Sequence, residues 1–159
     1  MDLPRMMFPR LALALFLAAA PAATAVAQER QWSLDAGDSD AYLVFGVPET
    51  DDVGVSFWCT IRTNEVQIML AEADPHLKVG RNAPITVTAG KTTVTLSGKV
   101  SDNEEGATTS IEASMPATSK IFPALLAADR FKVHVGKQNY VFPLGDADLS
   151  GLLDLCRKP

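Results

Sequence analysis

The chain has 159 residues, of which 47% are hydrophobic and 21% are charged, and its formal net charge at pH 7 is −5. An acidic surface disfavours binding to nucleic acid or to anionic lipid, because both associations need a cationic field. We therefore expect no nucleic-acid partner.

Residues 1–27 predict a secretory signal peptide. Arg5 and Arg10 precede an apolar run over 11–20, and small residues follow up to Ala27. A basic flank, a short apolar segment and small side chains before the cut are the features of exported precursors. We expect cleavage after Ala27 rather than a retained anchor, because the apolar run is shorter than the ~20 residues that span a bilayer.

Cleavage would leave 28–159 as a single β-rich domain, located in the periplasm or secreted. The length of segment 28–159 is typical of a single domain with one hydrophobic core. No other apolar segment is long enough to cross a bilayer, so no membrane span is expected after cleavage.

Hydrophobic and polar residues alternate in several segments of this domain, which predicts half-buried β-strands. The alternation occurs over 55–61, 66–70, 85–89, 94–96 and 111–115. Turn signals occur at 49–54, 89–91 and 101–108. Short strands at this spacing predict an antiparallel β-sandwich or barrel.

The next part of the chain predicts a short helix followed by the last hairpin. Phe122, Leu125 and Leu126 fall at helical spacing within 119–128, and Pro123 would lie in the first turn. Alternation over 131–135, a turn at 136–139 and a second strand ending at Pro143 predict a hairpin.

A C-terminal helix is predicted by an apolar stripe at i, i+3, i+4 and i+7, which consists of Leu149, Leu152, Leu153 and Cys156. Asp146 or Asp148 can cap its first turn, and Arg157 and Lys158 suit its C-terminal end.

Cys59 and Cys156 are the only cysteines, and two independent periodicities direct them inward. Cys59 faces the core from a strand, and Cys156 faces it from the terminal helix. Two cysteines allow one intramolecular pairing, and an exported chain matures where thiols oxidise. We therefore predict a Cys59–Cys156 disulfide rather than two buried thiols.

No motif predicts a metal ion or a cofactor. Residues 146–151 imitate the opening of a calcium loop, but Arg157 stands where a closing Glu is needed, so helix capping explains the segment better. His76 and His134 have no neighbour at ligand spacing. We expect both histidines to be solvated.

Catalytic motifs are also missing from the sequence. There is no Gly-x-Ser-x-Gly elbow, although a triad assembled from distant residues stays open. Carboxylates cluster at Asp35, Asp38 and Asp40 and again over 49–52. Both clusters fall in turn-like segments, where Asp favours tight bends, rather than across a glycosidase cleft.

Trp58 lies on the strand face opposite Phe57 and Cys59, which leaves two interpretations open. If that face meets solvent, Trp58 and Tyr42 form a binding patch that can anchor a partner or stack on a sugar. If a second layer covers the face, Trp58 belongs to the core, which is the commoner environment for a large aromatic side chain. The same question applies to Trp32.

Several segments together resemble a set of exported small β-domain proteins of Gram-negative bacteria with uncharacterised function; they are 42–52, Phe57-Trp58-Cys59, Phe142-Pro143-Leu144 and 153–156. The resemblance implies a periplasmic location and the same cysteine pair, but no activity. Residues 121–153 are also distantly similar to the invasion-associated locus B family in their helix, hairpin and Phe142-Pro143-Leu144. That family has more cysteines at other positions, so its proposed role at the cell envelope carries over only weakly.

Two main hypotheses follow. The first is an exported module that binds a protein or an envelope component through a sheet face or an edge strand. The alternative is a small cell-envelope hydrolase whose site combines distant carboxylates with His76 or His134. A stress-resistant structural protein without a specific ligand is a third possibility.

Overall fold

The computed structural model describes residues 29–103 and 108–157. This part of the chain is mainly β, with nine strands and two helices, which confirms the predicted fold class. The elements are β1 (Gln31–Ala36), β2 (Asp40–Gly46), β3 (Val53–Thr60), β4 (Glu65–Ala73), β5 (Asn82–Ala89), β6 (Thr92–Asn103), β7 (Thr108–Pro116), α1 (Ile121–Leu126), β8 (Arg130–Val135), β9 (Gln138–Pro143) and α2 (Leu149–Cys156).

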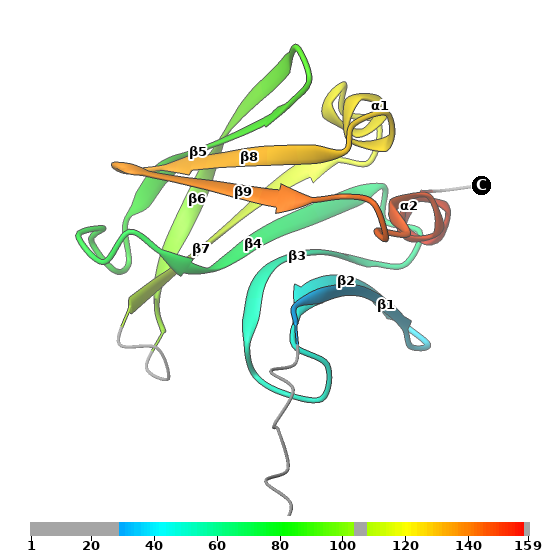
Figure 1. The fold of residues 1–159 in the computed structure, drawn as a ribbon, viewed down its shortest axis with the longest axis horizontal. Helices are drawn as coiled ribbons and strands as arrows, with labels where there is room; N and C mark the ends of the chain where they lie inside the picture. Colours follow the sequence, from blue (N-terminus) through cyan, green and yellow to red (C-terminus); the bar gives the residue numbers. More distant parts are fainter. Residues whose placement is uncertain (1–28, 104–107, 158–159) are drawn as a thin grey trace, which may run out of the picture.

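All nine strands form one antiparallel sheet in the order β1-β2-β3-β4-β7-β6-β5-β8-β9. The sheet curls into a half-barrel (Figure 1). Of the two architectures left open by the sequence, the barrel-like curl is observed, and a sandwich of two sheets is not. Strand β4 pairs with β7 rather than with β5, so a non-local contact holds the centre of the sheet.

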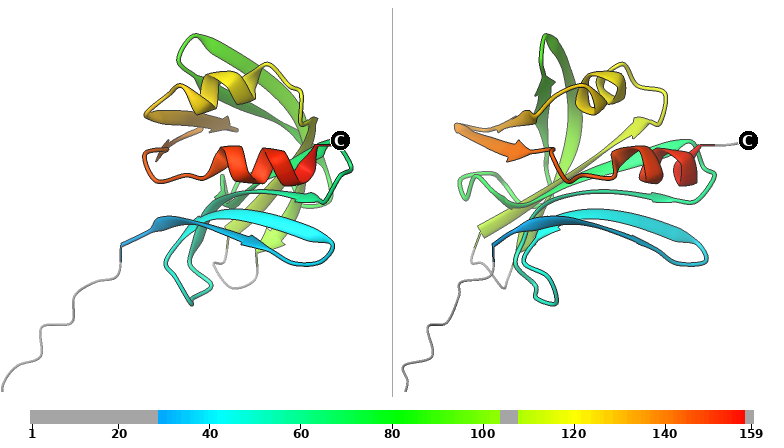
Figure 2. Two further views of the ribbon diagram at one scale, coloured as in Figure 1. Left: turned by 90° about the vertical axis from the view of Figure 1, so that its right-hand side faces the viewer. Right: turned by 45° about the vertical axis from the view of Figure 1, so that its right-hand side comes forward.

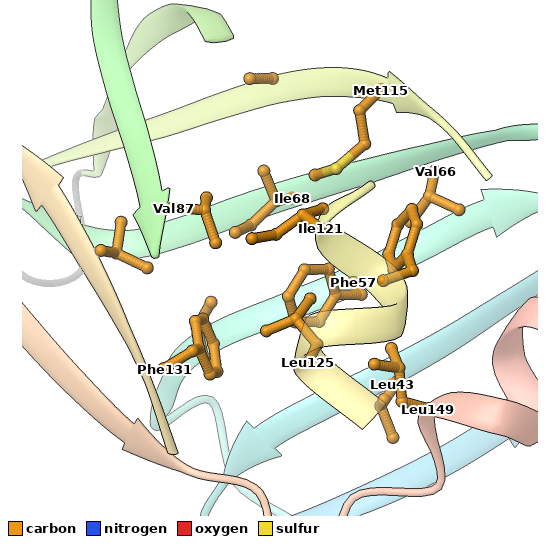
Figure 3. Close-up of a cluster of buried hydrophobic side chains, with 14 of the residues drawn as sticks. Leu43, Phe57, Val66, Ile68, Val87, Met115, Ile121, Leu125, Phe131 and Leu149 are labelled. Carbon is orange, nitrogen blue, oxygen red and sulfur yellow. The ribbon is translucent and has the colours of Figure 1, made fainter. Parts of the chain in front are cut away.

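The core lies on the concave face of the sheet, where alternate strand residues point inward. Phe57 is opposite Ile68 in register, and both side chains are fully buried. The rings of Phe57 and Phe131 lie 5.7 Å apart, and Figure 3 shows them beside side chains of α1. The core therefore joins distant strands and a helix in one cluster.

Most of the predicted inward positions are buried, but β6 differs in its first half. Val94 and Leu96 are only half-buried. Strand β6 pairs with β7 only from Lys99 to Asn103, so its earlier residues diverge from β7 and lose a neighbour on that side. The two strands form a fork that begins at the pair of Lys99 and Glu112.

Helix α2 occupies the gap between the two ends of the sheet. It lies between β9 and the β1–β2 hairpin in both views of Figure 2, and it packs on β2 and β3. Its buried side chains are the predicted stripe of Leu149, Leu152, Leu153 and Cys156. Cys59 and Cys156 form the predicted disulfide, with Cα atoms 5.7 Å apart and a sequence separation of 97.

The two edge strands of the sheet, β1 and β9, meet through Trp32. The indole Nε1–H of Trp32 donates to the carbonyl oxygen of Pro143 at 2.7 Å. Its backbone N–H donates to the carboxylate of Asp146 at 3.2 Å, and its ring centroid is 6.4 Å from that of Phe131. With an exposed fraction of 6%, Trp32 is a core residue.

Strands β1 and β2 contain carboxylates that the sequence places in turn-like segments, so that expectation is wrong for two of them. Asp35 lies in β1, opposite Tyr42, and Asp40 begins β2. The side chain of Asp40 accepts hydrogen bonds from the hydroxyl groups of Ser39 and Thr60, which lower its pKa. Backbone pairing between neighbouring strands therefore outweighs the local preference of Asp for turns.

Three predicted boundaries shift. Strand β6 continues to Asn103 and β7 begins at Thr108, so residues of the expected 101–108 turn are paired, and 104–107 lie outside the described residues. The last hairpin has a two-residue turn, Gly136-Lys137, because Asn139 pairs with His134. Helix α1 is shorter than 119–128, since the backbone bonds that join 119 to 122 and 125 to 128 run from residue i to i+3 and form four-residue turns at its ends.

The cap of α2 is Asp148, whose carboxylate accepts the backbone N–H of Gly151 at 2.9 Å. This confirms helix capping as the role of the calcium-like segment. Arg157 donates to the carbonyl oxygen of Ala117 at 3.4 Å. Lys158 and the predicted leader fall outside the described residues, within which no helix has the length and apolarity to cross a membrane.

Candidate functional site

The convex face of the sheet carries an aromatic pair, Tyr42 on β2 and Trp58 on β3. The two residues are direct cross-strand neighbours. Their ring centroids are 5.8 Å apart and their planes differ by 18°, so the rings are stacked. Tyr42 is 41% exposed and Trp58 is half-buried. The structure therefore unites the two residues proposed as a binding patch.

The alternation of buried residues explains this placement. Phe57 and Cys59 are buried, and Trp58 between them must point to the opposite face. Ala41 and Leu43 are also buried, which turns Tyr42 outward. Both helices pack on the concave side, and no second layer formed by residues 29–103 or 108–157 covers the pair.

A groove of about 350 Å³ borders the pair on the side of β1 and is called here the acidic groove. Its wall is the loop over 47–52, which is held by the hydroxyl of Thr50 bonding to the carbonyl oxygen of Val47 at 2.8 Å. Its lining combines apolar and acidic side chains, among them Asp35, Tyr42, Val44, Pro48 and Glu49.

A second hollow, of about 480 Å³, lies on the other side of the pair and is called here the polar hollow. It opens at the fork where β6 leaves β7. Its lining carries amide, hydroxyl and charged groups, including those of Gln67, Asn82, Ser97, Lys99, Glu112 and Ser114. Gln67 is the cross-strand neighbour of Trp58, so the aromatic pair and the polar hollow are continuous.

His76 is paired with a carboxylate, which the sequence does not indicate. Its Nδ1–H donates to Asp74 at 2.9 Å, while the side chain of His76 stays 86% exposed and that of Asp74 only 3%. Asp74 also accepts the backbone N–H of Lys137 at 2.9 Å and that of His76 at 3.0 Å. These three donors, Lys137 first, lower the pKa of Asp74 from 3.8 to about 2.

The Asp74–His76 pair does not complete a hydrolase triad in the described part of the chain. The side chain of His76 has no hydrogen-bond partner there other than Asp74, and no serine or threonine hydroxyl reaches it. The pair instead joins the β4–β5 loop to the turn of the last hairpin through Lys137. Its geometry is that of a structural contact.

His134 lies on the convex face, where its Nδ1 is 3.0 Å from the side-chain oxygen of Asn139. Across residues 29–103 and 108–157, no three histidine, cysteine or acidic side chains come together as a metal site. The two histidines proposed for a hydrolase are on separate elements, β8 and the β4–β5 loop, and no contact joins their rings.

Comparisons of the chain with protein-family models, with curated proteins and with solved structures found no match. The two family resemblances therefore remain predictions.

Proposed function

We propose that this protein is an exported, periplasmic or secreted, binding module that holds an envelope component or a protein on the convex face of its sheet. The observation that carries the proposal is the stacked pair of Tyr42 and Trp58, presented outward between two hollows. The disulfide and the predicted leader are both compatible with export.

Aromatic residues are effective anchors because they bury a large area with few rotatable bonds. Within residues 29–103 and 108–157, the exposed large hydrophobic residues are Tyr42, Val79, Leu126 and Val141, and of these Tyr42 alone has an aromatic partner. A buried tyrosine or tryptophan contact commonly contributes 2 kcal/mol or more to binding, at about tenfold in affinity per 1.4 kcal/mol.

The alternative proposal, a small cell-envelope hydrolase, would use His76 or His134. Asp74 and His76 are the one carboxylate–histidine contact in the described residues, which makes this pair the place to test. If any hydrolytic activity is found, the double variant His76→Ala/His134→Ala should abolish it. Unchanged activity would remove this proposal.

Retention of envelope material tests the binding proposal. The disulfide-bonded protein, recovered from the periplasm, is immobilised and exposed separately to soluble periplasmic extract and to purified envelope fractions. We expect at least one fraction to be retained, and the double variant Tyr42→Ala/Trp58→Ala to reduce its apparent affinity tenfold or more.

Val141→Ala is the matched control, because Val141 is 53% exposed on β9, away from the pair. It should bind like the parent protein. No retained fraction under any condition, or equal retention by the double variant, would contradict the proposal.

A further inference from the structure

We propose that the ligand of this face is a neutral glycan chain, with one sugar ring against Tyr42 and Trp58 and the following sugars over the polar hollow. This inference rests on the proposed binding function and specifies its ligand. It is drawn from the juxtaposition of an aromatic surface with a depression lined by hydrogen-bonding side chains on one continuous face.

The aromatic pair provides the first half of a sugar site. A pyranose ring has an apolar face of C–H groups, and the negative face of an aromatic ring attracts such groups. Trp58 and Tyr42 have nearly parallel rings, and their exposed area is flanked by hollows on both sides. A flat apolar sugar face therefore has a surface to cover.

The polar hollow provides the second half, because a sugar also has a rim of hydroxyl groups. Amides both donate and accept hydrogen bonds, and serine hydroxyls do the same. Gln67, Asn82 and Ser97 supply these groups around a space of about 480 Å³, and Ser114, whose hydroxyl donates to Glu65, supplies its oxygen as an acceptor. That volume lies in the range of small-molecule sites, about 300–1,000 Å³.

The two halves are in line. Trp58 pairs with Gln67, and Gln67 pairs with Ser114 on β7, so one cross-strand row leads from the aromatic ring to the hollow. Trp58 and Ser114 are two strands apart, which corresponds to about 10 Å. A chain of sugars laid across the strands would contact both.

The charges near the site disfavour charged polymers as ligands. Lys99 and Glu112 are opposite each other in the register, so their formal charges cancel, and Glu65, which accepts a hydrogen bond from the Ser114 hydroxyl, adds one negative charge beside the hollow. The net charge of −5 disfavours polyanions such as nucleic acid or acidic glycans. The carboxylates that a cationic peptide would need are divided between the two sides of the aromatic pair: Asp35 and Glu49 lie in the acidic groove, and Glu65 and Glu112 lie at the polar hollow, where Lys99 opposes them.

Titration with defined oligomers tests the inference. The probes are chitohexaose, cellohexaose and maltohexaose as neutral glycans, an alginate hexamer as an acidic glycan, and hexalysine as a cationic peptide. In a Trp32→Phe background, Trp58 is the single remaining tryptophan, so a change in emission on binding reports this site. Calorimetry supplies the affinity independently of fluorescence.

We expect at least one neutral hexamer to bind, and the alginate hexamer and hexalysine not to bind. Trp58→Ala should weaken that binding at least tenfold, and Gln67→Ala and Ser114→Ala about threefold to tenfold each. Val141→Ala, on β9 away from the aromatic pair, is the control and should leave the affinity unchanged.

Two results would overturn the inference. One is no binding of any neutral hexamer. The other is binding that Trp58→Ala and Gln67→Ala leave unaltered. If the neutral hexamers fail while a protease-sensitive envelope fraction is still retained through Tyr42 and Trp58, the glycan inference is wrong and the binding module stands. If both assays fail, both proposals fall.

Discussion

Trp32 and Pro143 join the two edge strands of the sheet, through a hydrogen bond of 2.7 Å from the indole N–H to the backbone carbonyl oxygen. Strand β1 and strand β9 are separated by seven strands in the sheet order, yet this bond brings their ends together. The Trp32 side chain therefore bridges the two ends of the half-barrel at this point, and α2 fills the space where the strands separate.

The substitution Trp32→Phe should loosen this bridge. It removes the hydrogen bond to Pro143 but keeps an aromatic ring near Phe57 and Phe131. We expect the free energy of unfolding to fall by about 0.5–1.5 kcal/mol for the bond, with some additional loss of packing. Urea denaturation measures it. Trp58→Phe is the matched control and should cost less, and equal losses would contradict the role of the bond.

Removal of the disulfide should destabilise the protein strongly. Cys59→Ala/Cys156→Ala releases a loop whose ends are 97 positions apart, for which chain entropy predicts about 4.7 kcal/mol and typical losses are about 2–5 kcal/mol. The midpoint of denaturation should fall to that of the reduced parent protein. A double variant as stable as the oxidised parent would show that the bond contributes nothing.

Asp74 should make the protein sensitive to acid. Its pKa is about 2 in the folded protein against an ordinary value of 3.8, so its stabilising effect is complete above about pH 4 and is lost as the pH falls toward 2. The groups that face Asp74 are His76 and Tyr140. Burial raises the pKa of Tyr140, and the negative charges of Asp74 and Glu72 raise it further. Asp74→Asn should flatten the dependence of the melting temperature on pH between 4 and 2. Asp154→Asn, on the exposed side of α2, should retain the parent profile.

Gly136→Ala should destabilise more than Gly90→Ala. Both glycines have positive φ, 58° and 55°, which costs a non-glycine residue about 1–2 kcal/mol. A methyl group at Gly136 would also lie 2.5 Å from Oδ2 of Asp74, whereas nothing lies within 4 Å at Gly90. The difference in unfolding midpoint between the two variants measures this contact. Similar losses in both would argue that the hairpin turn moves freely away from Asp74.

The accuracy of the sequence-based predictions follows the range of the interactions involved. The stripe from Leu149 to Cys156 and the cap at Asp148 are local features, and the helix they predict has the observed bounds. Strands β1 and β2 are not predicted from the sequence, because Asp35 and Asp40 locally indicate turns. The backbone pairing that outweighs this turn preference is with residues further along the chain. Alternation of Ala41, Leu43 and Phe45 was the signal available for β2.

Prediction of the candidate site requires both the local residue pattern and the packing of distant elements. The two-residue alternation in β3 is sufficient to place Trp58 on the face opposite Cys59. Whether the Trp58 face meets solvent depends on where the two helices pack. The polar hollow could not be predicted, because it results from the separation of β6 from β7 before Lys99. Likewise, the bond from Lys137 to Asp74 links positions 63 apart, beyond any motif.

Helix α2 and its disulfide also determine the order of events as the chain is made. A polypeptide that is made from its N-terminus presents the apolar side of β2 and β3 long before α2 is available to pack on it. During that interval Cys59 is a lone thiol, waiting for a partner 97 positions later. Until α2 docks, the thiol of Cys59 lacks the partner that buries it, whereas in the folded protein both cysteines are buried.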